Sequence, residues 1–484
     1  MRLSDLTGSN GRASRIEVAG ITADSRAVLP GYLFAALQGL RADGTQFIPD
    51  AIKQGAVAVL AAKGTAIDAG EVFVVSDDNP RRQLALMAAR FYPRQPETIV
   101  AVTGTNGKTS TAEFAAQIWK RLGHSGGSLG TLGLRTALGS SEGNLTTPDP
   151  VTLHQSLDRL AREGIEHLAM EASSHGLDQY RLDGVRVSAA AFTNISHDHL
   201  DYHGSQEAYL AAKLRLFTEV MPEGGIAVLN ADVPEFETIR AACVGRRQLV
   251  LTYGAAAAAD FRLIAADPGP CGQTVEIAVQ GAVHRVLLPL YGSFQAENAL
   301  AALALVIATG ADRAAAVDAL GHLKGVTGRA QLVEELSSRA KIFVDYAHTP
   351  DALTHVLLAL RPHTKGKLVL VFGCGGNRDK AKRPEMGRIA AQLADVVIVT
   401  DDNPRDEDPA SIRSEIRASC PDAEDIPSRS RAIARGIALL EPGDLLVVAG
   451  KGHETGQIVG GRVLPFDDTA VIRKAILDRG RKQA

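Results

Sequence analysis

The sequence predicts an α/β protein of three domains whose middle domain is a doubly wound parallel sheet. One observation is the length of 484 residues, which suits about three domains of ordinary size. Another is the alternation of short β-branched apolar runs with helix-like stretches, which is typical of parallel sheets. The third is a glycine-rich loop at residues 103–110, between a predicted strand and a predicted helix. We therefore expect a central sheet of the P-loop type, with a small α/β domain before it and a Rossmann-like α/β domain after it.

The first domain is predicted to span residues 1–93. It contains a clear helical stretch at residues 82–90. The apolar runs that predict its strands lie at residues 21–26, 32–37, 56–60 and 72–75. Two prolines within residues 92–96 favour a linker to the next domain.

The middle and C-terminal domains are predicted at residues 97–325 and 326–484, with a boundary in the glycine-containing segment 325–329. Predicted strands of the middle domain lie at residues 100–102, 167–170, 189–192 and 225–229. Those of the C-terminal domain lie at residues 341–345, 368–372, 396–400 and 445–449. Helix-like segments separate these strands, so we expect a second α/β sheet after the central one. Ligands of such sheets bind beyond the carboxyl ends of the strands.

The loop at residues 103–110 predicts a site for a nucleoside triphosphate. It contains Gly104, Thr105, Asn106, Gly107, Lys108, Thr109 and Ser110. Such a loop directs backbone N–H groups and a helix N-terminus at phosphate, while the lysine neutralises charge and a threonine hydroxyl reaches Mg²⁺. The general motif has a further glycine where this chain has Val102, so the match is incomplete. A chance Gly-Lys-Thr turn is the alternative.

Two strand ends near this loop predict a metal site. Glu171 follows the strand at 167–170, and His199 lies in the segment 193–204 that follows the strand at 189–192. A carboxylate and an imidazole at adjacent strand ends suit Mg²⁺. The segment 193–204 contains three histidines, so a polar loop or a zinc site is an alternative, although no cysteine accompanies them. The pattern around Lys213 indicates no more than an exposed helix lysine.

Three polar loops of the C-terminal domain follow strands in the same way. They lie at residues 345–350, 373–380 and 450–454, and together they favour a site for a polar ligand over three ordinary turns. The pentapeptide Asp-Asp-Asn-Pro-Arg occurs twice, at residues 77–81 and at residues 401–405. A helix start explains the first copy, whereas Arg405 in the second is placed to hold a carboxylate through two hydrogen bonds.

The composition excludes several classes of function. The net charge of −3 shows no basic excess for nucleic acid. No apolar run is long enough to span a bilayer and no signal-peptide pattern follows Met1, so we expect a cytoplasmic protein that does not bind membranes. The four cysteines lie far apart and predict neither a disulfide framework nor a zinc site.

The assembled motifs resemble those of the Mur ligases. The resemblance covers all three domains, from Asp24 to Glu454, and rests on residues 104–109, 171–177, 194–204, 213, 325–329, 345–350 and 450–454. Glycine-loop usage in that family also accommodates Val102. The resemblance implies an ATP- and Mg²⁺-dependent ligase, usually monomeric. The similarity is to the branch that joins meso-diaminopimelate to UDP-N-acetylmuramoyl-L-alanyl-D-glutamate through an acyl phosphate.

The resemblance also implies roles for individual residues. Catalytic roles fall to Lys108, Lys213, His199 and Arg329, and metal ligation to Thr109, Glu171, His199 and Lys213, with Lys213 carbamylated. Nucleotide binding falls to the glycine loop with Asn298, Arg329 and Asp345. Binding of the UDP-muramyl dipeptide falls to Ser25, Thr146, Thr147, Ser173, Gln179 and Arg181. Binding of the amino acid falls to Arg378, Asp402, Asn403, Pro404, Arg405, Gly450 and Glu454.

Three alternatives stay open at this point. One is a homologue that adds L-lysine, which lacks the second carboxylate that Arg405 would bind. Another is a folylpolyglutamate synthetase, which shares the ATP chemistry and the architecture. The third is a nucleotide-binding module without ligase turnover.

Overall fold

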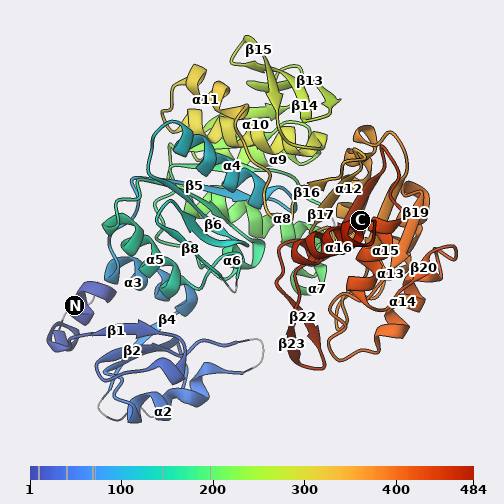
Figure 1. The fold of residues 1–484 in the computed structure, drawn as a ribbon. Coiled ribbons are helices and arrows are strands. Elements are labelled where there is room, and N and C mark those ends of the chain that lie inside the picture. Colours follow the sequence, from blue (N-terminus) through green and yellow to red (C-terminus); the bar gives the residue numbers. More distant parts are fainter. Residues whose placement is uncertain are drawn as a thin grey trace.

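A computed structural model describes residues 1–8, 11–39, 42–67, 70, 72–143, 145–196 and 198–483, the last four of these by their backbone only. Figure 1 shows three α/β parts, the first drawn in blue, the middle part in teal to yellow and the C-terminal part in orange to red. The predicted fold class is confirmed. No helix of the described residues is long and apolar enough to cross a membrane.

The N-terminal part is a parallel sheet in the order β1-β2-β3-β4. Its strands are β1 (Gly20–Thr22), β2 (Tyr32–Ala35), β3 (Ala58–Ala62) and β4 (Phe73–Asp77), and its longer helices are α2 (Ile48–Lys53) and α3 (Pro80–Phe91). The side chain of Asn79 accepts a hydrogen bond from the Arg82 N–H, and Pro80 occupies the first turn of α3. The first copy of the repeated pentapeptide therefore starts a helix, as predicted.

The middle part contains a sheet in the order β15-β14-β13-β12-β11-β10-β5-β9-β6-β7-β8. The inner strands are parallel: β5 (Thr98–Thr103), β6 (Gly126–Gly130), β9 (His167–Glu171), β10 (Ala189–Phe192), β11 (Ile226–Asn230) and β12 (Leu249–Gly254). Both edges carry further strands: β7 (Gly133–Thr136), β8 (Gly139–Ser141), β13 (Phe261–Gly269), β14 (Gly272–Val279) and β15 (Ala282–Leu288). β13 pairs parallel with β12, and the other pairings at the edges are antiparallel. None of these edge strands was predicted, and neither were the inner strands β6 and β12. The phosphate loop follows β5, which lies within the parallel region.

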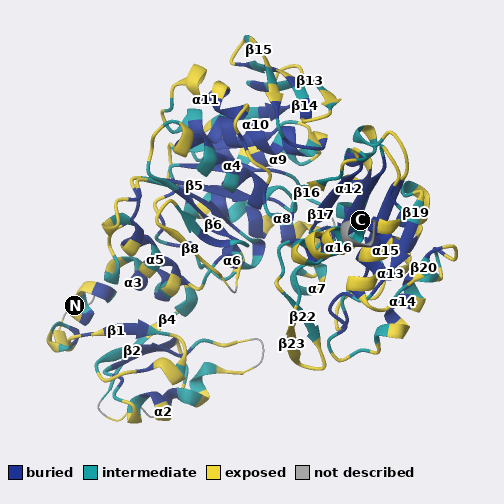
Figure 2. Cartoon of the chain, in the orientation of Figure 1, coloured by how far each residue is buried: buried dark blue, intermediate teal, exposed yellow. Residues whose placement is uncertain are grey.

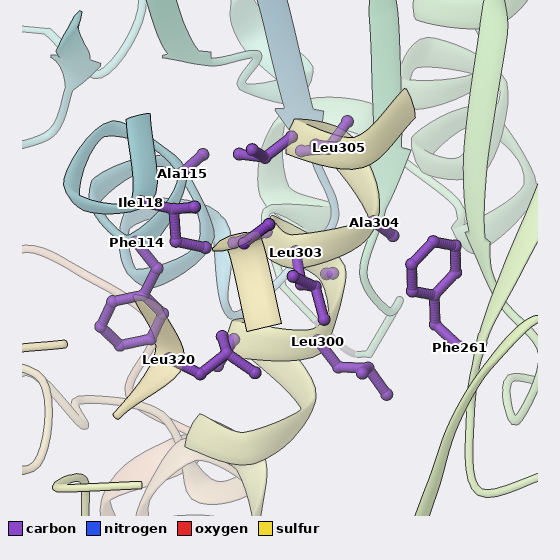
Figure 3. Close-up of a cluster of buried hydrophobic side chains, with 14 of the residues drawn as sticks. Phe114, Ala115, Ile118, Phe261, Leu300, Leu303, Ala304, Leu305 and Leu320 are labelled. Carbon is purple, nitrogen blue, oxygen red and sulfur yellow. The ribbon is translucent and has the colours of Figure 1, made fainter. Parts of the chain in front are cut away.

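Helices cover both faces of the middle sheet. One face packs against α4 (Lys108–Arg121), α10 (Ser293–Ala308) and α11 (Arg313–Leu320), and the other against α5 (Pro150–Arg162) and η4 (Leu216–Val220). Figure 3 shows Phe114 and Ile118 of α4 on one side of α10 and Phe261 on the other, with Leu300 and Leu303 of α10 between them. Figure 2 shows that buried residues concentrate at these contacts. Because α10 is apolar on nearly all sides, it lies within the part rather than on its surface.

The C-terminal part contains a sheet in the order β16-β17-β21-β18-β19-β20. Its strands are β16 (Gln331–Glu335), β17 (Lys341–Asp345), β18 (Leu368–Phe372), β19 (Val396–Val399), β20 (Glu424–Asp425) and β21 (Leu445–Ala449), and its longer helices are α12 (Pro350–Leu360), α13 (Lys382–Leu393), α14 (Pro409–Arg417), α15 (Arg429–Ala438) and α16 (Asp468–Gln483). All pairings are parallel except β16 with β17. The ends of β17, β18, β19 and β21 therefore lie on one edge.

The predicted domain limits fall in two connections between elements. The first is between Phe91, the last residue of α3, and Thr98, the first of β5. The second is between Leu320, the last residue of α11, and Gln331, the first of β16. Residues 93 and 325 remain predictions as limits of independent domains.

Candidate active site

The glycine loop joins β5 to the first residue of α4. Gly104 and Gly107 have φ angles of +141° and +86°, and a Cβ atom on them would overlap the side chains of Thr193 and Asn298, respectively. Only glycine satisfies both conditions. The segment that follows β10 also holds the loop, because the Asn106 N–H donates to the Asn194 side-chain oxygen at 2.9 Å. The conformation of the glycine loop is therefore built into the packing of the middle part.

Two lysines converge on this loop. Lys108 Nζ donates to the carbonyl oxygens of Gly104 and Thr105 at 2.9 and 2.7 Å. Lys213 Nζ, from α8 (Gln206–Arg215), donates to the same Gly104 oxygen at 2.7 Å and lies 4.2 Å from the centre of the Tyr209 ring. The residue is 1% exposed, so the interpretation of Lys213 as an exposed helix lysine is wrong. The local sequence pattern could not predict the burial of Lys213, because the burial comes from the glycine loop that packs over α8.

Burial sets the protonation of these lysines. It lowers the pKa of Lys213 well below the ordinary value for lysine, and the positive charge of Lys108 lowers that pKa further. Burial also lowers the pKa of Lys108, which the charges of Glu171 and Asp198 partly offset. Lys213 has no ion pair among the described residues. Its amine is therefore the group of the site that most favours the neutral, nucleophilic form.

The predicted metal ligands lie around the two lysines. Glu171 ends β9, is buried, and accepts hydrogen bonds from the N–H and Oγ1 of Thr131 at 2.7 and 3.1 Å. His199 has a left-handed backbone (φ +53°), and burial lowers its pKa, as do the charges of Lys108 and Lys213. His197, in the same loop, lies outside the described residues.

These ligands are not pre-assembled as a tight cluster. Among the described residues, Glu171 and His199 do not form a group of three His, Cys, Asp or Glu donors within 4.8 Å. Thr109 supplies a hydroxyl, and the remaining oxygens would come from the nucleotide or from a modified Lys213. This oxygen-rich donor set fits Mg²⁺ better than it fits zinc.

The C-terminal part reaches the glycine loop. Arg329 Nη2 lies 3.4 Å from Thr109 Oγ1, and its guanidinium lies 4.5 Å from the centre of the Tyr346 ring. The Asn106 side chain donates to Asp351 of α12 at 3.2 Å. The structure thus brings the glycine loop together with Arg329, as predicted. It also brings the loop together with Asp351, which was not predicted as a site residue. Only its position at the start of α12 could have indicated it.

Asn298 and Asp345 support this contact from the two sides. Asn298 donates to Gln295, and the Gln295 side chain donates to the Arg329 carbonyl at 2.9 Å. Asp345 accepts from the backbone N–H groups of Ala330 and Ala347 at 2.6 and 2.7 Å, while burial raises its pKa. The nucleotide-binding roles of Asn298 and Asp345 remain predictions, because both side chains hold other protein groups here.

A second network connects Glu171 to the residues predicted to hold the UDP-linked substrate. Thr131 Oγ1, which donates to Glu171, lies 3.0 Å from Thr146 Oγ1. Thr147 Oγ1 donates to the Glu171 carbonyl and accepts from the Ser173 hydroxyl, both at 3.0 Å.

Arg181 extends this network toward a cavity. It donates to the Thr147 carbonyl and to the Gln179 side chain, both at 2.7 Å, and Gln179 donates to the Tyr202 hydroxyl at 3.1 Å. The cavity has a volume of about 360 Å³ and is lined by Gln38, Gly39, Arg81, Asp178, Gln179 and Tyr202. Arg81 belongs to the first copy of the repeated pentapeptide, so that copy contributes to a polar cavity as well as starting α3.

Ser25 lies apart from this cavity. It lines a different hollow of about 560 Å³ with Arg26, Phe47, Asp50, Lys53 and Gln54. Asp24 binds Arg26 through two hydrogen bonds at 2.9 and 2.8 Å, and Arg26 lowers the pKa of the Asp24 carboxyl. The structure therefore does not bring Ser25 together with Gln179 and Arg181.

The predicted amino-acid site is assembled at the strand ends of the C-terminal sheet. Asn403 Nδ2 donates to Glu454 at 2.9 Å, and Lys451 Nζ donates to the Asn403 oxygen and to Glu454 at 3.0 and 2.9 Å. A Cβ atom on Gly450 would lie 2.7 Å from Asp402 Oδ2. Lys451 is fully buried and was not predicted. This ion pair between buried Lys451 and half-buried Glu454 holds Glu454 in place.

Arg405 is half-buried, unlike the buried arginines of this part. Its Nη1 donates to the Gly376 carbonyl at 2.8 Å, and its backbone is left-handed (φ +52°). Burial lowers the pKa of Arg405, and the charge of Arg378 lowers it further.

Neither Arg405 nor Arg378 has an ion pair among the described residues. By contrast, each of the buried arginines Arg383, Arg413 and Arg429 pairs with a carboxylate, at 3.0, 2.6 and 2.7 Å for Glu407, Asp425 and Asp468. Arg405 is half-buried and Arg378 is exposed. Among the described residues their guanidinium groups donate to backbone carbonyls and not to carboxylates, so both are available for a carboxylate from outside the chain.

Known proteins match this chain along most of its length. Three family models match it: the Mur ligase family, catalytic domain, over residues 17–92; the Mur ligase middle domain over residues 102–306; and the Mur ligase, glutamate ligase domain, over residues 328–452.

Similar proteins match the whole chain. A UDP-N-acetylmuramoyl-L-alanyl-D-glutamate–2,6-diaminopimelate ligase of Bradyrhizobium diazoefficiens is 51% identical over 99% of this chain and 100% of its own. The protein of that name from Caulobacter vibrioides is 51% identical over 98% of each chain. A solved structure of a ligase with the same name is 33% identical, covers 99% of both chains and has a TM-score of 0.74. The resemblance seen in the sequence is confirmed, and the chain belongs to the Mur ligase family.

Proposed function

We propose that this chain is an ATP-dependent ligase that joins meso-diaminopimelate to UDP-N-acetylmuramoyl-L-alanyl-D-glutamate in the synthesis of peptidoglycan precursors. The observation that carries the proposal is the convergence of Lys108, Lys213 and Arg329 on one glycine loop. Relatives that are about half identical over nearly the full length bear the name of this activity. We also propose that the enzyme works as a cytoplasmic monomer.

The first half of the proposed reaction moves the γ-phosphoryl group of ATP to the free D-glutamate carboxylate. The products of this step are an acyl phosphate and ADP. The loop amides and Lys108 bind the phosphates, and Arg329 approaches them from the C-terminal part. A Mg²⁺ ion held by Thr109, Glu171 and His199 would neutralise phosphate charge. Two anions must meet in this step, which explains the concentration of cationic groups around the loop.

Lys213 is proposed to act as a carbamate. A neutral amine adds to CO₂ and releases a proton, which leaves an anionic carbamate on Nζ. The burial that lowers the pKa of Lys213 favours the neutral amine that this addition needs. The product would supply an oxygen ligand next to Lys108, at a position where the unmodified amine forms no ion pair with any residue that the structure describes.

The second half of the proposed reaction joins the amine to the acyl phosphate. The amino group of diaminopimelate attacks the acyl carbon, an amide forms, and phosphate leaves. Arg405 and Arg378 would hold the distal carboxylate of the amino acid, and the fixed Glu454 would accept from its distal ammonium. Contact between the C-terminal part and the glycine loop would exclude water from the acyl phosphate.

Release of phosphate tests this function directly. We expect phosphate only when ATP, Mg²⁺, the UDP-muramyl dipeptide and diaminopimelate are present together. Release with folate and glutamate instead would favour the folylpolyglutamate synthetase, and ATP binding without release under any condition would favour a non-catalytic module. Equal or better specificity for L-lysine would contradict the choice of amino acid.

Gly107→Ala is expected to weaken nucleotide binding. The new Cβ would overlap Asn298, and φ of +86° is unfavourable for alanine by about 1 kcal/mol or more. We expect the Kd for ATP to rise at least about 10-fold because the loop amides lose their alignment. Isothermal titration calorimetry measures this, with Gly123→Ala, in the open turn after α4, as the control. Unchanged ATP affinity would argue against this loop as the phosphate site.

A further inference from the structure

A second group of side chains that could hold a metal ion lies where strand β9 of the middle sheet begins. The glycine loop lies at the other end of the parallel strands, after the last residue of β5. It consists of His124, Glu166 and His167, whose ligand atoms lie within 4.8 Å of one another. No other such group of His, Cys, Asp or Glu occurs in the part of the chain that the structure describes. None of the roles discussed above uses these three residues.

Backbone hydrogen bonds hold the three residues close together. His124 lies in the turn between α4 and β6, and His167 is the first residue of β9. The N–H groups of Glu166 and His167 both donate to the Ser125 carbonyl, at 2.9 and 3.1 Å. These bonds fasten the turn to the start of the strand. The positions of the three side chains therefore follow from the pairing of β6 with β9.

The His167 ring has the surroundings of a metal ligand. It lies 4.5 Å from the His124 ring and 5.1 Å from the Trp119 ring, between ring centres. Its Nδ1 is buried and has no hydrogen-bond partner among the described residues. The unpartnered ring nitrogen is therefore free of competing protein hydrogen bonds among the described residues.

A carboxylate completes the donor set. Glu166 supplies the carboxylate of the group, and its ligand oxygen lies within 4.8 Å of a ring nitrogen of each histidine. Two imidazoles with one carboxylate are a common zinc ligand set, with water or a further carboxylate as the fourth ligand. Tetrahedral zinc needs its ligand atoms about 3.4 Å apart. The side chains of His124 and Glu166 are exposed, so they can rotate to bring ligand atoms now within 4.8 Å of one another to about 3.4 Å.

We propose that His124, Glu166 and His167 bind a divalent transition-metal ion of the zinc class, which joins the turn after α4 to the start of β9. The site is structural rather than catalytic. Glu171 ends the same strand, roughly 13 Å from His167 at the usual rise per residue. The bound ion would therefore stabilise the middle sheet from the edge that faces away from the reaction.

Trp119 provides a specific probe, because it is the only tryptophan of the 484-residue sequence. Its ring is next to His167, and it lies roughly 16 Å along α4 from Lys108 at 1.5 Å per residue. Paramagnetic Co²⁺ or Cu²⁺ bound at His167 should quench its fluorescence. Zn²⁺, which has a filled d shell, should displace the quencher and restore the signal.

The experiment titrates metal-free, full-length protein with Co²⁺ in the presence of excess Mg²⁺. We expect saturable quenching with one ion per chain, reversed by Zn²⁺ and by a chelator. His124→Ala and Glu166→Gln should raise the Kd for Co²⁺ at least about 10-fold. His322→Ala removes an exposed histidine that contacts Arg121 at the end of α4 but does not belong to the group, so it should leave the Kd unchanged.

Thermal unfolding gives a second readout. Zn²⁺ should raise the Tm of the parent chain and of His322→Ala, but not that of His124→Ala, because only a ligand that binds the folded state stabilises it. His124 and Glu166 are exposed, so their variants should fold like the parent without metal. Quenching that does not saturate, or that is equally strong in His124→Ala, would overturn the proposal.

Discussion

Replacing Lys213 with methionine should inactivate the enzyme and make it more stable. The variant keeps the apolar part of the side chain but removes the only group at this position that could form a carbamate. We expect kcat to fall on the order of 10²- to 10³-fold, the usual loss when a group that stabilises transition-state charge is removed. Phosphate release at saturating substrates measures the first effect.

The stability effect follows from the depressed pKa. In the unfolded chain Lys213 is protonated up to its ordinary pKa of about 10.4, whereas burial disfavours that proton in the folded state. The unfolded state thus binds more protons, so the parent is penalised at neutral pH and recovers as pH rises toward 10.4. We expect Lys213→Met to unfold at higher temperature at pH 7, by roughly 2–4 °C for each kcal/mol gained, and the gain to shrink with rising pH.

Unfolding should be followed in CO₂-depleted buffer, because carbamate formation would itself stabilise the folded parent. Lys120→Met, on the exposed last turn of α4, is the matched control and should change neither activity nor Tm by much. A variant that is less stable than the parent at pH 7 would contradict the account of Lys213 as a buried, poorly compensated amine.

The fold was predictable because its inner strands are local features of the sequence. Runs such as Val100–Val102 and residues 368–372 are β-branched and apolar, as strands covered on both faces require. The antiparallel strands β13 to β15 were missed. They lie at a sheet edge with one exposed face, and their apolar residues alternate with polar ones, a weaker signal than the continuous apolar runs of the inner strands.

The site was predictable only in part from local pattern. Glu171 and the glycine loop follow strands, so topology places them on one edge. Lys213 could not be placed in this way, because its contact with Gly104 spans 109 residues of sequence. Lys451 has the same difficulty, since its partner Asn403 lies 48 residues away. Burial of a charged side chain depends on such distant partners, and no periodicity records them.

Arg405 has no ion pair among the described residues, so its replacement should strongly affect the binding of diaminopimelate. Arg405→Ala should raise the KM for diaminopimelate by about 10- to 100-fold, the cost of losing a charge-assisted hydrogen-bonded pair of about 1.5–3 kcal/mol. The change in kcat should be small, because the side chain holds the distal end of the amino acid rather than the reacting amine. Steady-state kinetics with varied diaminopimelate measures both constants.

The same variant should narrow the preference for diaminopimelate over L-lysine. In the parent, lysine would leave the half-buried guanidinium of Arg405 without a carboxylate, which penalises lysine binding. Removing the guanidinium removes that penalty, so the ratio of the two kcat/KM values should fall even if lysine remains a poor substrate. Arg431→Ala, an exposed arginine of α15, should leave the ratio unchanged. If Arg405→Ala lowers kcat/KM equally for both amino acids, Arg405 supports the loop through Gly376 and does not select the substrate.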